Sequence, residues 1–278
     1  MPGETPNWEK FPTDRGSRKR LLDEARKHTA EKVAPLELSW GAANSPLNES
    51  PLFPKGWSFS NFFKEVVPTG YEDLQTYIEE ALKDRRGNAV GIEFGGPGSE
   101  LFAGFSEGFF KKTLGICLVD SRDLMSPDPL PRDKARNHEV ISGNMFDSAT
   151  YETLNKKLHG SRVDVIFERL LGGIDLVPRE PHMVGATLRN WYKLLNEGGL
   201  LFAQVPEDFS NFVYALQLKL RSENVKGLEI NTARNKALSS FSSFALRLRK
   251  LQNAPEELPL LDLRTTTAIS QHRQSRRS

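Results

Sequence analysis

The chain has 278 residues, enough for one sizeable α/β domain with extensions, and its formal net charge of +2 does not by itself indicate a nucleic-acid-binding protein. Its single cysteine, Cys117, excludes a disulfide framework within the chain and argues against a cysteine-based metal site, so we expect no metal. The N-terminus lacks the apolar segment of a signal peptide, and no apolar run approaches the roughly 20 residues that span a bilayer. These features predict a cytoplasmic protein that does not cross a membrane.

Residues 1–69 are predicted to form an N-terminal extension. A helical composition over 14–33 is followed by an irregular stretch, Trp40–Trp57, that carries Leu52 and Phe53 among Pro, Ser, Asn and Gly. An irregular segment with large apolar groups normally packs on something. We expect it to dock on the main domain, and a lid over an active site is the alternative.

A predicted helix over 69–82 leads into the most informative stretch of the chain. An apolar run from Ala89 ends at the acid Glu93, and Gly95, Gly96 and Gly98 follow within five residues. This pattern predicts a strand, a tight turn and a helix over 99–110, with Ser99 or Ser106 as a candidate cap for that helix. Free N–H groups at the turn would face a ligand with acceptor atoms.

Three interpretations of this turn compete with a plain glycine turn that binds nothing. The phosphate-loop pattern G-x-x-x-x-G-K-[ST] is absent, and the dinucleotide pattern G-x-G-x-x-G has Leu101 where its third small residue belongs. An acid two residues before the first glycine, Glu93-Phe94-Gly95, resembles motif I of the class I S-adenosylmethionine-dependent methyltransferases. The chain departs from that motif, acid-x-Gly-x-Gly-x-Gly, by placing Pro97 and Ser99 at its later two positions.

The resemblance implies a cofactor site along the ends of the following strands. A predicted strand from Thr113 ends at Asp120, which would bind the ribose hydroxyls, while prolines in 121–137 predict a shortened or absent crossover helix. After a third predicted strand from Glu139, the exit loop would hold the adenine. The cofactor-binding residues expected in this way are Glu93, Gly95, Gly96, Gly98, Asp120, Ser121, Asn144, Met145, Phe146, Asp147 and Glu168.

The fourth predicted strand, Arg162–Glu168, ends where the family places the transferring methyl group. Glu168 is therefore the first candidate for a base or a substrate-orienting group, and Arg169 and His182 are the next candidates. The Asn/Asp-Pro-Pro-Tyr signature is missing, which argues against methylation of adenine bases or glutamine amides.

The rest of the domain continues the alternation of helices and strands. A helix from Pro181, a fifth strand at Leu200–Val205 and a further helix precede two strands near the C-terminus, one of them at Ser243–Lys250 with alternating apolar residues. Residues 251–278 are predicted to form an irregular, disordered tail with a basic end.

We therefore expect an α/β fold: a Rossmann-like, mostly parallel seven-stranded sheet with one antiparallel strand near the C-terminus and helices on both faces, over 70–250. The resemblance implies an S-adenosylmethionine-dependent methyltransferase, with S-adenosyl-L-methionine as cofactor and a small molecule favoured as acceptor, while protein or RNA acceptors and the oligomeric state stay open. The alternatives are an inactive methyltransferase-like partner subunit and an NAD(P)-dependent oxidoreductase.

Overall fold

The computed structural model describes residues 47–48, 58–117, 133–143, 145, 148–168, 181–206, 210–234 and 243–259. Within these ranges it describes only the backbone at 142, 181–184, 206, 210–212 and 243–244. No helix in the described part of the chain has the length and apolar character needed to cross a bilayer.

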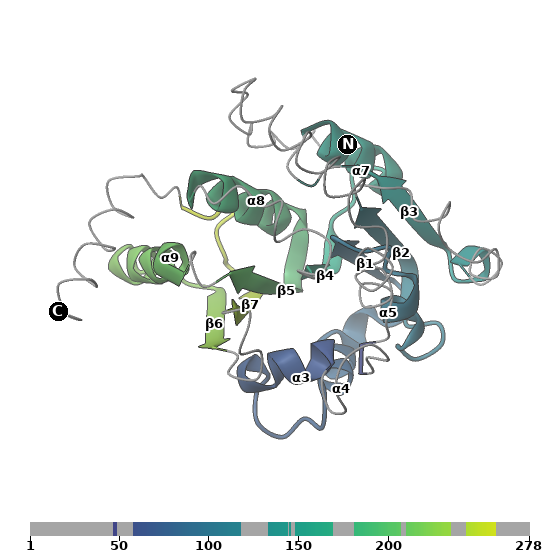
Figure 1. Ribbon diagram of the computed structural model, residues 1–278, viewed down its shortest axis with the longest axis horizontal. Helices are drawn as coiled ribbons and strands as arrows, with labels where there is room; N and C mark the ends of the chain where they lie inside the picture. The colour runs from purple at the N-terminus through teal and green to yellow at the C-terminus, as the bar shows by residue number, and fades with distance from the viewer. Residues whose placement is uncertain are drawn as a thin grey trace, which may run out of the picture.

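Seven strands in the described residues form one sheet, in the order β3-β2-β1-β4-β5-β7-β6 (Figure 1). They are β1 (Ala89–Phe94), β2 (Phe110–Cys117), β3 (His138–Ser142), β4 (Val163–Glu168), β5 (Leu195–Pro206), β6 (Leu228–Arg234) and β7 (Ser243–Lys250). β7 pairs antiparallel with β5 and β6, and the other four pairings are parallel. Six strands therefore share one direction, which confirms the Rossmann-like sheet with one antiparallel strand near the C-terminus.

Helices cover both faces of this sheet. They are α3 (Phe59–Phe63), α4 (Leu74–Ala81), α5 (Ser99–Ala103), α7 (Ser148–Leu158), α8 (Pro181–Leu194) and α9 (Ser210–Ser222), with short 3-10 helices at Lys64–Val66 and Lys83–Arg85. One buried apolar cluster includes side chains of α7, α8 and α9, and a second includes side chains of α3, α4 and α5. Figure 1 shows α7 and α8 on the opposite side of the sheet from α3, α4 and α5.

The second cluster is rich in aromatic rings. Phe63 packs edge-on against Phe202 of β5, and Phe167 of β4 stacks on Phe202 with ring centroids 5.8 Å apart. Burying a phenylalanine side chain contributes about 1.5–3 kcal/mol. The short helix α3 is therefore fixed to the sheet by its rings, although it is only five residues long.

The predicted helix before β1 is shorter than expected but has the expected buried side. α4 begins after Asp73, whose carboxylate accepts a hydrogen bond from the Thr76 N–H at 2.7 Å, a side-chain cap at the first turn. Leu74, Tyr77 and Ile78 are buried, as the helical spacing predicted. The helix begins five residues after the predicted start and ends at Ala81, one residue before the predicted end, and a 3-10 helix follows at Lys83–Arg85.

Two predicted boundaries are wrong. The helix expected over 99–110 ends at Ala103, and β2 begins at Phe110, three residues before the predicted start. The fifth strand begins at Leu195 instead of Leu200, because the Gly198-Gly199 stretch lies inside the strand, where the register with β4 shifts. Gly198 has a positive φ of 84°, a backbone angle that glycine adopts readily and that a bulge of this kind requires.

The segment after β7 packs on α8 as far as Pro259. Leu258 is buried, the Tyr192 hydroxyl donates to the Pro255 carbonyl at 2.6 Å, and Glu257 lies 2.5 Å from Arg189 and 3.0 Å from Lys193. The rest of the tail predicted from residue 251 lies outside the described residues. Of the irregular N-terminal stretch, the structure describes Leu47 and Asn48, and Leu47 is buried among the α3–α5 side chains.

Candidate functional site

Two acids lie at the carboxyl ends of the central strands β1 and β4. Glu93 is fully buried, and Glu168 is 4% exposed. In the parallel register Glu93 pairs with Phe167, and Phe94 pairs with Glu168, so the acids are one position apart on neighbouring strands. Side chains alternate along a strand, so the two acids leave the sheet on opposite faces but close to the same edge.

The Glu168 carboxylate turns along this edge toward β5. Its Oε2 accepts a hydrogen bond from the backbone N–H of Gln204 at 3.1 Å. Burial raises the pKa of Glu168 to about 8; the Gln204 hydrogen bond opposes this increase, and the negative charge of Glu93 adds to it. A glutamate with such a pKa carries a proton at neutral pH and can exchange it near physiological pH.

The glycine turn lies against β2 and does not stand clear of the sheet. The Gly95 N–H donates to the Ile116 carbonyl at 2.9 Å, and Gly96 forms a β-bridge with the same residue. Pro97 crosses over Gly115 so closely that a Cβ at position 115 would overlap the Pro97 carbonyl group. The expectation of free N–H groups at this turn is therefore wrong for Gly95.

Two glycines of the turn have backbone angles that other residues adopt at a cost. Gly95 has φ 87° and Gly98 has φ 77°. At Gly98 a side chain would also meet the His138 and Phe102 rings at 3.0 and 3.3 Å. The turn therefore needs these glycines for its own geometry, whatever it binds.

His138, at the start of β3, holds the turn in place, and our sequence analysis did not find it. Its Nε2 lies 2.8 Å from the Pro97 carbonyl oxygen, and its Nδ1 lies 2.8 Å from the Thr113 hydroxyl. A carbonyl only accepts, so Nε2 must carry a proton, and a neutral ring then accepts the Thr113 proton at Nδ1. No local pattern marks this histidine, because its partner is 41 residues earlier in the chain.

Neither serine expected to cap the helix after the turn does so. Gly98 occupies the cap position of α5, with no side-chain cap bond. The Ser99 hydroxyl instead donates to the buried carboxylate of Asp133, and Ser106 donates from its hydroxyl and its N–H to Glu79 of α4, at 2.6 and 2.8 Å. These bonds attach α5 and its following loop to their neighbours.

The loop after β3 is described only in part. Met145 is buried, with 8% of its surface exposed, and its carbonyl accepts a hydrogen bond from the Tyr151 hydroxyl of α7 at 2.8 Å. The Tyr151 ring lies 6.1 Å from Phe94, the residue next to Glu93. Tyr151 thus links Met145 to the end of β1.

The remaining predicted site residues lie outside the described part of the chain. They are Asp120, Ser121, Asn144, Phe146, Asp147 and Arg169. His182 lies in the first turn of α8, where only the backbone is described. The structure thus brings Glu93, Gly95, Gly96, Gly98, Met145 and Glu168 to the region of the carboxyl ends of β1, β3 and β4.

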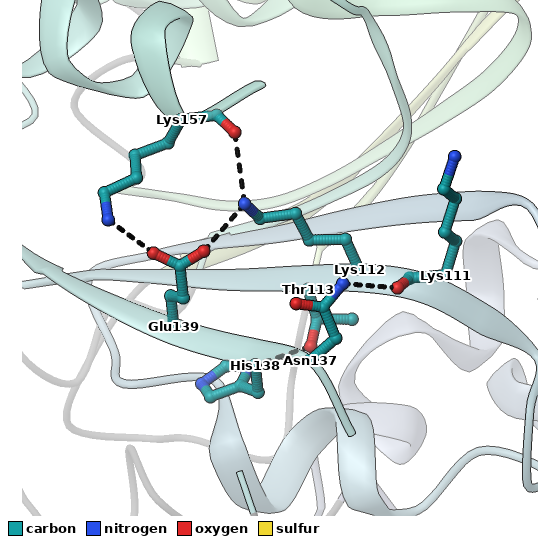
Figure 2. A network of polar contacts seen from close by, with 7 residues as sticks. All are labelled: Lys111, Lys112, Thr113, Asn137, His138, Glu139 and Lys157. Carbon is teal, nitrogen blue, oxygen red and sulfur yellow. Dashed lines mark hydrogen bonds and ion pairs between the residues drawn. The ribbon is translucent and has the colours of Figure 1, made fainter. Parts of the chain in front are cut away.

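A different polar network occupies the opposite ends of β2 and β3 (Figure 2). Glu139 lies between two ammonium groups, 2.7 Å from Lys112 and 2.6 Å from Lys157, and Lys112 also donates to the Lys157 carbonyl at 3.1 Å. The two lysines hold the pKa of Glu139 below its ordinary value. This network ties the end of α7 to the sheet. Glu139 aligns with Ile166 of β4, so it lies two register positions before Glu168 and is separated from it by the strands β2 and β1.

Within the described residues, the edge beside the glycine turn carries buried acids. The buried charged side chains described there are Glu93, Glu168 and Asp133, while the described buried cations are bonded elsewhere. Arg247 donates to Tyr77, Lys250 to the Leu195 carbonyl, and Lys193 and Arg189 pair with Glu257. An edge of this character favours a ligand with positive charge and disfavours a diphosphate.

Comparisons with known proteins find matches among solved structures. No protein-family model matches the sequence, and the search of curated proteins finds no match. Among solved structures, an rRNA methylase from Streptococcus thermophilus is 16% identical with a TM-score of 0.43, covering 63% of this chain and 94% of its own.

Two further matches differ in their stated acceptor. An O-methyltransferase from Bacillus cereus, in complex with S-adenosylhomocysteine, is 11% identical with a TM-score of 0.42, covering 86% of this chain and 93% of its own. The N-methyltransferase NodS from Bradyrhizobium japonicum is 13% identical with a TM-score of 0.39. The match covers 64% of this chain and 94% of NodS. All three TM-scores are below 0.5, and the description of the fold as Rossmann-like rests on the strand order and strand directions of this chain itself.

Proposed function

We propose that this protein binds S-adenosyl-L-methionine at the carboxyl edge of β1 and β4 and transfers its methyl group. The carrying observation is the pair of buried acids, Glu93 and Glu168, at the ends of these neighbouring central strands beside the glycine turn. The cofactor has an ammonium and a sulfonium group, and buried carboxylates stabilise such charges strongly. A nicotinamide dinucleotide would instead bring a diphosphate to an acidic edge.

The proposal carries over the cofactor-binding roles that the sequence resemblance implies. Glu93 would hold the methionine ammonium, and Met145 offers an apolar side chain for the adenine. Asp120 and Ser121 would hold the ribose, and Asn144, Phe146 and Asp147 would complete the adenine site. The turn through Gly95, Gly96 and Gly98 would form the wall between the amino-acid and ribose parts.

When bound, the sulfonium supplies an electrophilic methyl group, so the protein has only to orient the acceptor and exclude water. The acceptor lone pair forms the new bond to the methyl carbon, and the electrons of the broken carbon–sulfur bond stay on sulfur. Where the acceptor carries a proton, the ionised Glu168 carboxylate would take it. A pKa of about 8 suits a group that accepts a proton near neutral pH. Arg169 and His182 remain candidate partners in this step.

A small-molecule acceptor is the finer proposal. It rests on the N-terminal stretch that the sequence predicts to dock on the domain, where Leu47 packs among the α3–α5 side chains. Incubation of the protein with methyl-labelled cofactor and a cell extract, followed by separation into small molecules, proteins and RNA, tests it. Label in the small-molecule fraction supports the proposal, and label in protein or RNA overturns it.

Binding experiments test the cofactor itself. We expect S-adenosylhomocysteine and S-adenosylmethionine to raise the melting temperature and to bind in isothermal titration, whereas NAD⁺ and NADP⁺ do neither. Glu93→Gln should weaken S-adenosylmethionine binding at least tenfold, and the remote variant Glu139→Gln should leave it unchanged. Stabilisation by a nicotinamide cofactor alone would overturn the proposal in favour of an oxidoreductase.

A second candidate function is a methyltransferase-like partner subunit without catalysis. The observation that favours it is the closed glycine turn, with the Gly95 N–H bonded to Ile116 and Pro97 lying against Gly115. Failure of pure, folded protein to bind S-adenosylhomocysteine would favour this second function.

A further inference from the structure

We infer that Tyr151 is a positioning residue for the adenosine half of the proposed cofactor: its hydroxyl fixes the Met145 carbonyl, and with it the apolar side chain offered to the adenine. The inference rests on the proposed function and assigns a role to a residue of α7 that acts through Met145. It predicts that the hydroxyl matters for every ligand that contains adenosine, including one without an amino-acid group.

The first step is that Tyr151 is itself held firmly. It is fully buried near the start of α7, and Leu154 and Leu158, which follow at helical spacing, are buried in the same apolar cluster. At the other end of this helix, Lys157 pairs with Glu139 of β3 at 2.6 Å (Figure 2). Packing at its start and an ion pair at its end fix α7 on the sheet, so the core sets the place of the Tyr151 hydroxyl.

The second step is the direction of the hydrogen bond. A carbonyl oxygen only accepts, so the Tyr151 O–H donates to the Met145 carbonyl, at 2.8 Å. Burial raises the pKa of Tyr151, so the hydroxyl keeps the proton that it donates. Met145 is 8% exposed and belongs to the same apolar cluster as the tyrosine. A carbonyl in such a place is costly to leave without its donor, so the bond holds Met145 in one position.

The third step is that the chain leaving β3 lies close against the same helix. The Gly143 N–H donates to the Cys117 carbonyl of β2 at 2.8 Å. A Cβ at position 143 would lie 2.7 Å from the Thr150 hydroxyl oxygen, so a side chain there would overlap the first turn of α7. Gly143 and Met145 are thus both held by that turn, through the neighbouring residues Thr150 and Tyr151.

The fourth step connects Tyr151 to the end of β1. Its ring centroid lies 6.1 Å from that of Phe94, the residue after Glu93. Phe94 in turn lies 5.1 Å from the ring of Trp191 in α8. One side chain therefore spans the two halves of the proposed site: its ring packs beside the strand end that would hold the methionine ammonium, and its hydroxyl holds Met145, which would cover the adenine.

Removal of the hydroxyl alone tests this role. Tyr151→Phe keeps the ring against Phe94 and removes the donor to Met145. Isothermal titration, at a temperature where every variant is folded, measures the affinity for S-adenosylhomocysteine and for methylthioadenosine, which contains the adenosine but no amino-acid group. We expect both affinities to fall about three- to tenfold, because binding must then order a residue that the hydroxyl holds in the unaltered protein.

Tyr192→Phe is the matched control. Tyr192 is also fully buried, and its hydroxyl also donates to a backbone carbonyl, that of Pro255 at 2.6 Å in the segment after β7. Each substitution removes one hydrogen bond of the same kind, so we expect both to lower the melting temperature by about 2–4 °C. Tyr192→Phe should leave both affinities unchanged, which separates positioning of the ligand from a general loss of stability.

Glu93→Gln distinguishes the two halves of the site. It removes the proposed partner of the ammonium, so it should weaken binding of S-adenosylhomocysteine and leave binding of methylthioadenosine unchanged. Tyr151→Phe should instead weaken binding of both ligands by the same factor.

The outcomes separate this inference from the proposed function. Unchanged binding of methylthioadenosine by Tyr151→Phe would overturn the positioning role and leave the cofactor site standing. Equal losses of affinity in Tyr151→Phe and Tyr192→Phe would overturn it as well, because the effect would then be one of stability alone. Failure of the unaltered, folded protein to bind either ligand would overturn the proposed function itself, and this inference with it.

Discussion

Glu168 and Glu139 belong to the same sheet, yet burial raises the pKa of the first to about 8 while two lysines lower the pKa of the second. Glu168 ends β4 at the edge beside the glycine turn. Glu139 is near the start of β3, between Lys112 and Lys157 (Figure 2). The same side chain is thus paired with two cations on β3, whereas on β4 the described residues supply it with one backbone N–H.

This difference indicates what each end of the sheet does. An acid placed between two lysines needs nothing further, so the Glu139 end serves to attach α7 to β2 and β3. A buried acid with a raised pKa lowers stability at neutral pH and is a candidate for a functional site. The comparison therefore favours the carboxyl edge of β1 and β4 as the binding site.

The largest expected effect tests whether the glycine turn must lie against β2. Gly115→Ala places a methyl group where the Pro97 carbonyl lies, and backbone atoms cannot rotate away. We expect a loss of about 3 kcal/mol or more in the free energy of unfolding, measured by urea denaturation. A loss below about 1 kcal/mol would mean that the turn moves freely off the strand. Gly104→Ala, where φ is −72° and the added Cβ would meet no atom closer than 3.4 Å, controls for the loss of a glycine alone.

The next effect concerns the stability cost of the buried acid. The pKa of Glu168 is raised on folding, so the folded state holds a proton that the unfolded state loses between its ordinary pKa and pH 8. The contribution of Glu168 to the free energy of unfolding is fully present below its ordinary pKa and is lost as the pH rises toward 8. Glu168→Gln should therefore become more stable than the unaltered protein by about 3 kcal/mol as the pH increases from 4.5 to 7.

Chemical denaturation of both proteins across this pH range provides the measurement. The quantity of interest is the difference between the two stabilities, because other acids change the stability of both proteins equally. A difference that is constant with pH would contradict the raised pKa.

A smaller effect tests His138 as the residue that positions the turn. His138→Gln can still direct an N–H toward the Pro97 carbonyl from the Nε2 position, whereas His138→Asn is too short to reach it. We expect the asparagine variant to lose about 1–3 kcal/mol and the glutamine variant clearly less. Binding of S-adenosylhomocysteine should follow the same order. Equal losses in both variants would show that the ring packing against Phe102, and not the hydrogen bond, matters.

The sheet could be predicted because its signals are local. Strands buried on both faces appear as continuous apolar runs, as in Leu114–Cys117 of β2, and β7 alternates apolar and charged residues from Leu246 to Arg249. The error at α5 has an equally physical cause. Phe105 and Phe109 have helical spacing, but they belong to the turn after Gly104, where their rings stack 6.1 Å apart.

The site could be predicted only where it coincides with the ends of strands. Glu93 and Glu168 end apolar runs, so the alternation of strands and helices identifies them. The Gly95 bond to Ile116, the crossing of Pro97 over Gly115 and the support from His138 depend on tertiary contacts across 18 to 41 residues. No pattern within one segment encodes them.

The smallest expected effect completes the comparison at Glu139 on β3. Glu139→Gln leaves Lys112 and Lys157 without their shared partner, but all three side chains are partly exposed, with 18–48% of their surface accessible. We expect a loss of at most about 1 kcal/mol at pH 7 and low salt, decreasing further in 1 M salt. Because the pKa of Glu139 is lowered on folding, its contribution is present above its ordinary pKa and disappears as the pH falls through the lowered value. The same substitution therefore destabilises the protein at Glu139 and stabilises it at Glu168 as the pH rises. If both variants changed stability in the same direction between pH 4.5 and 7, the electrostatic contrast between Glu139 and Glu168 would be wrong.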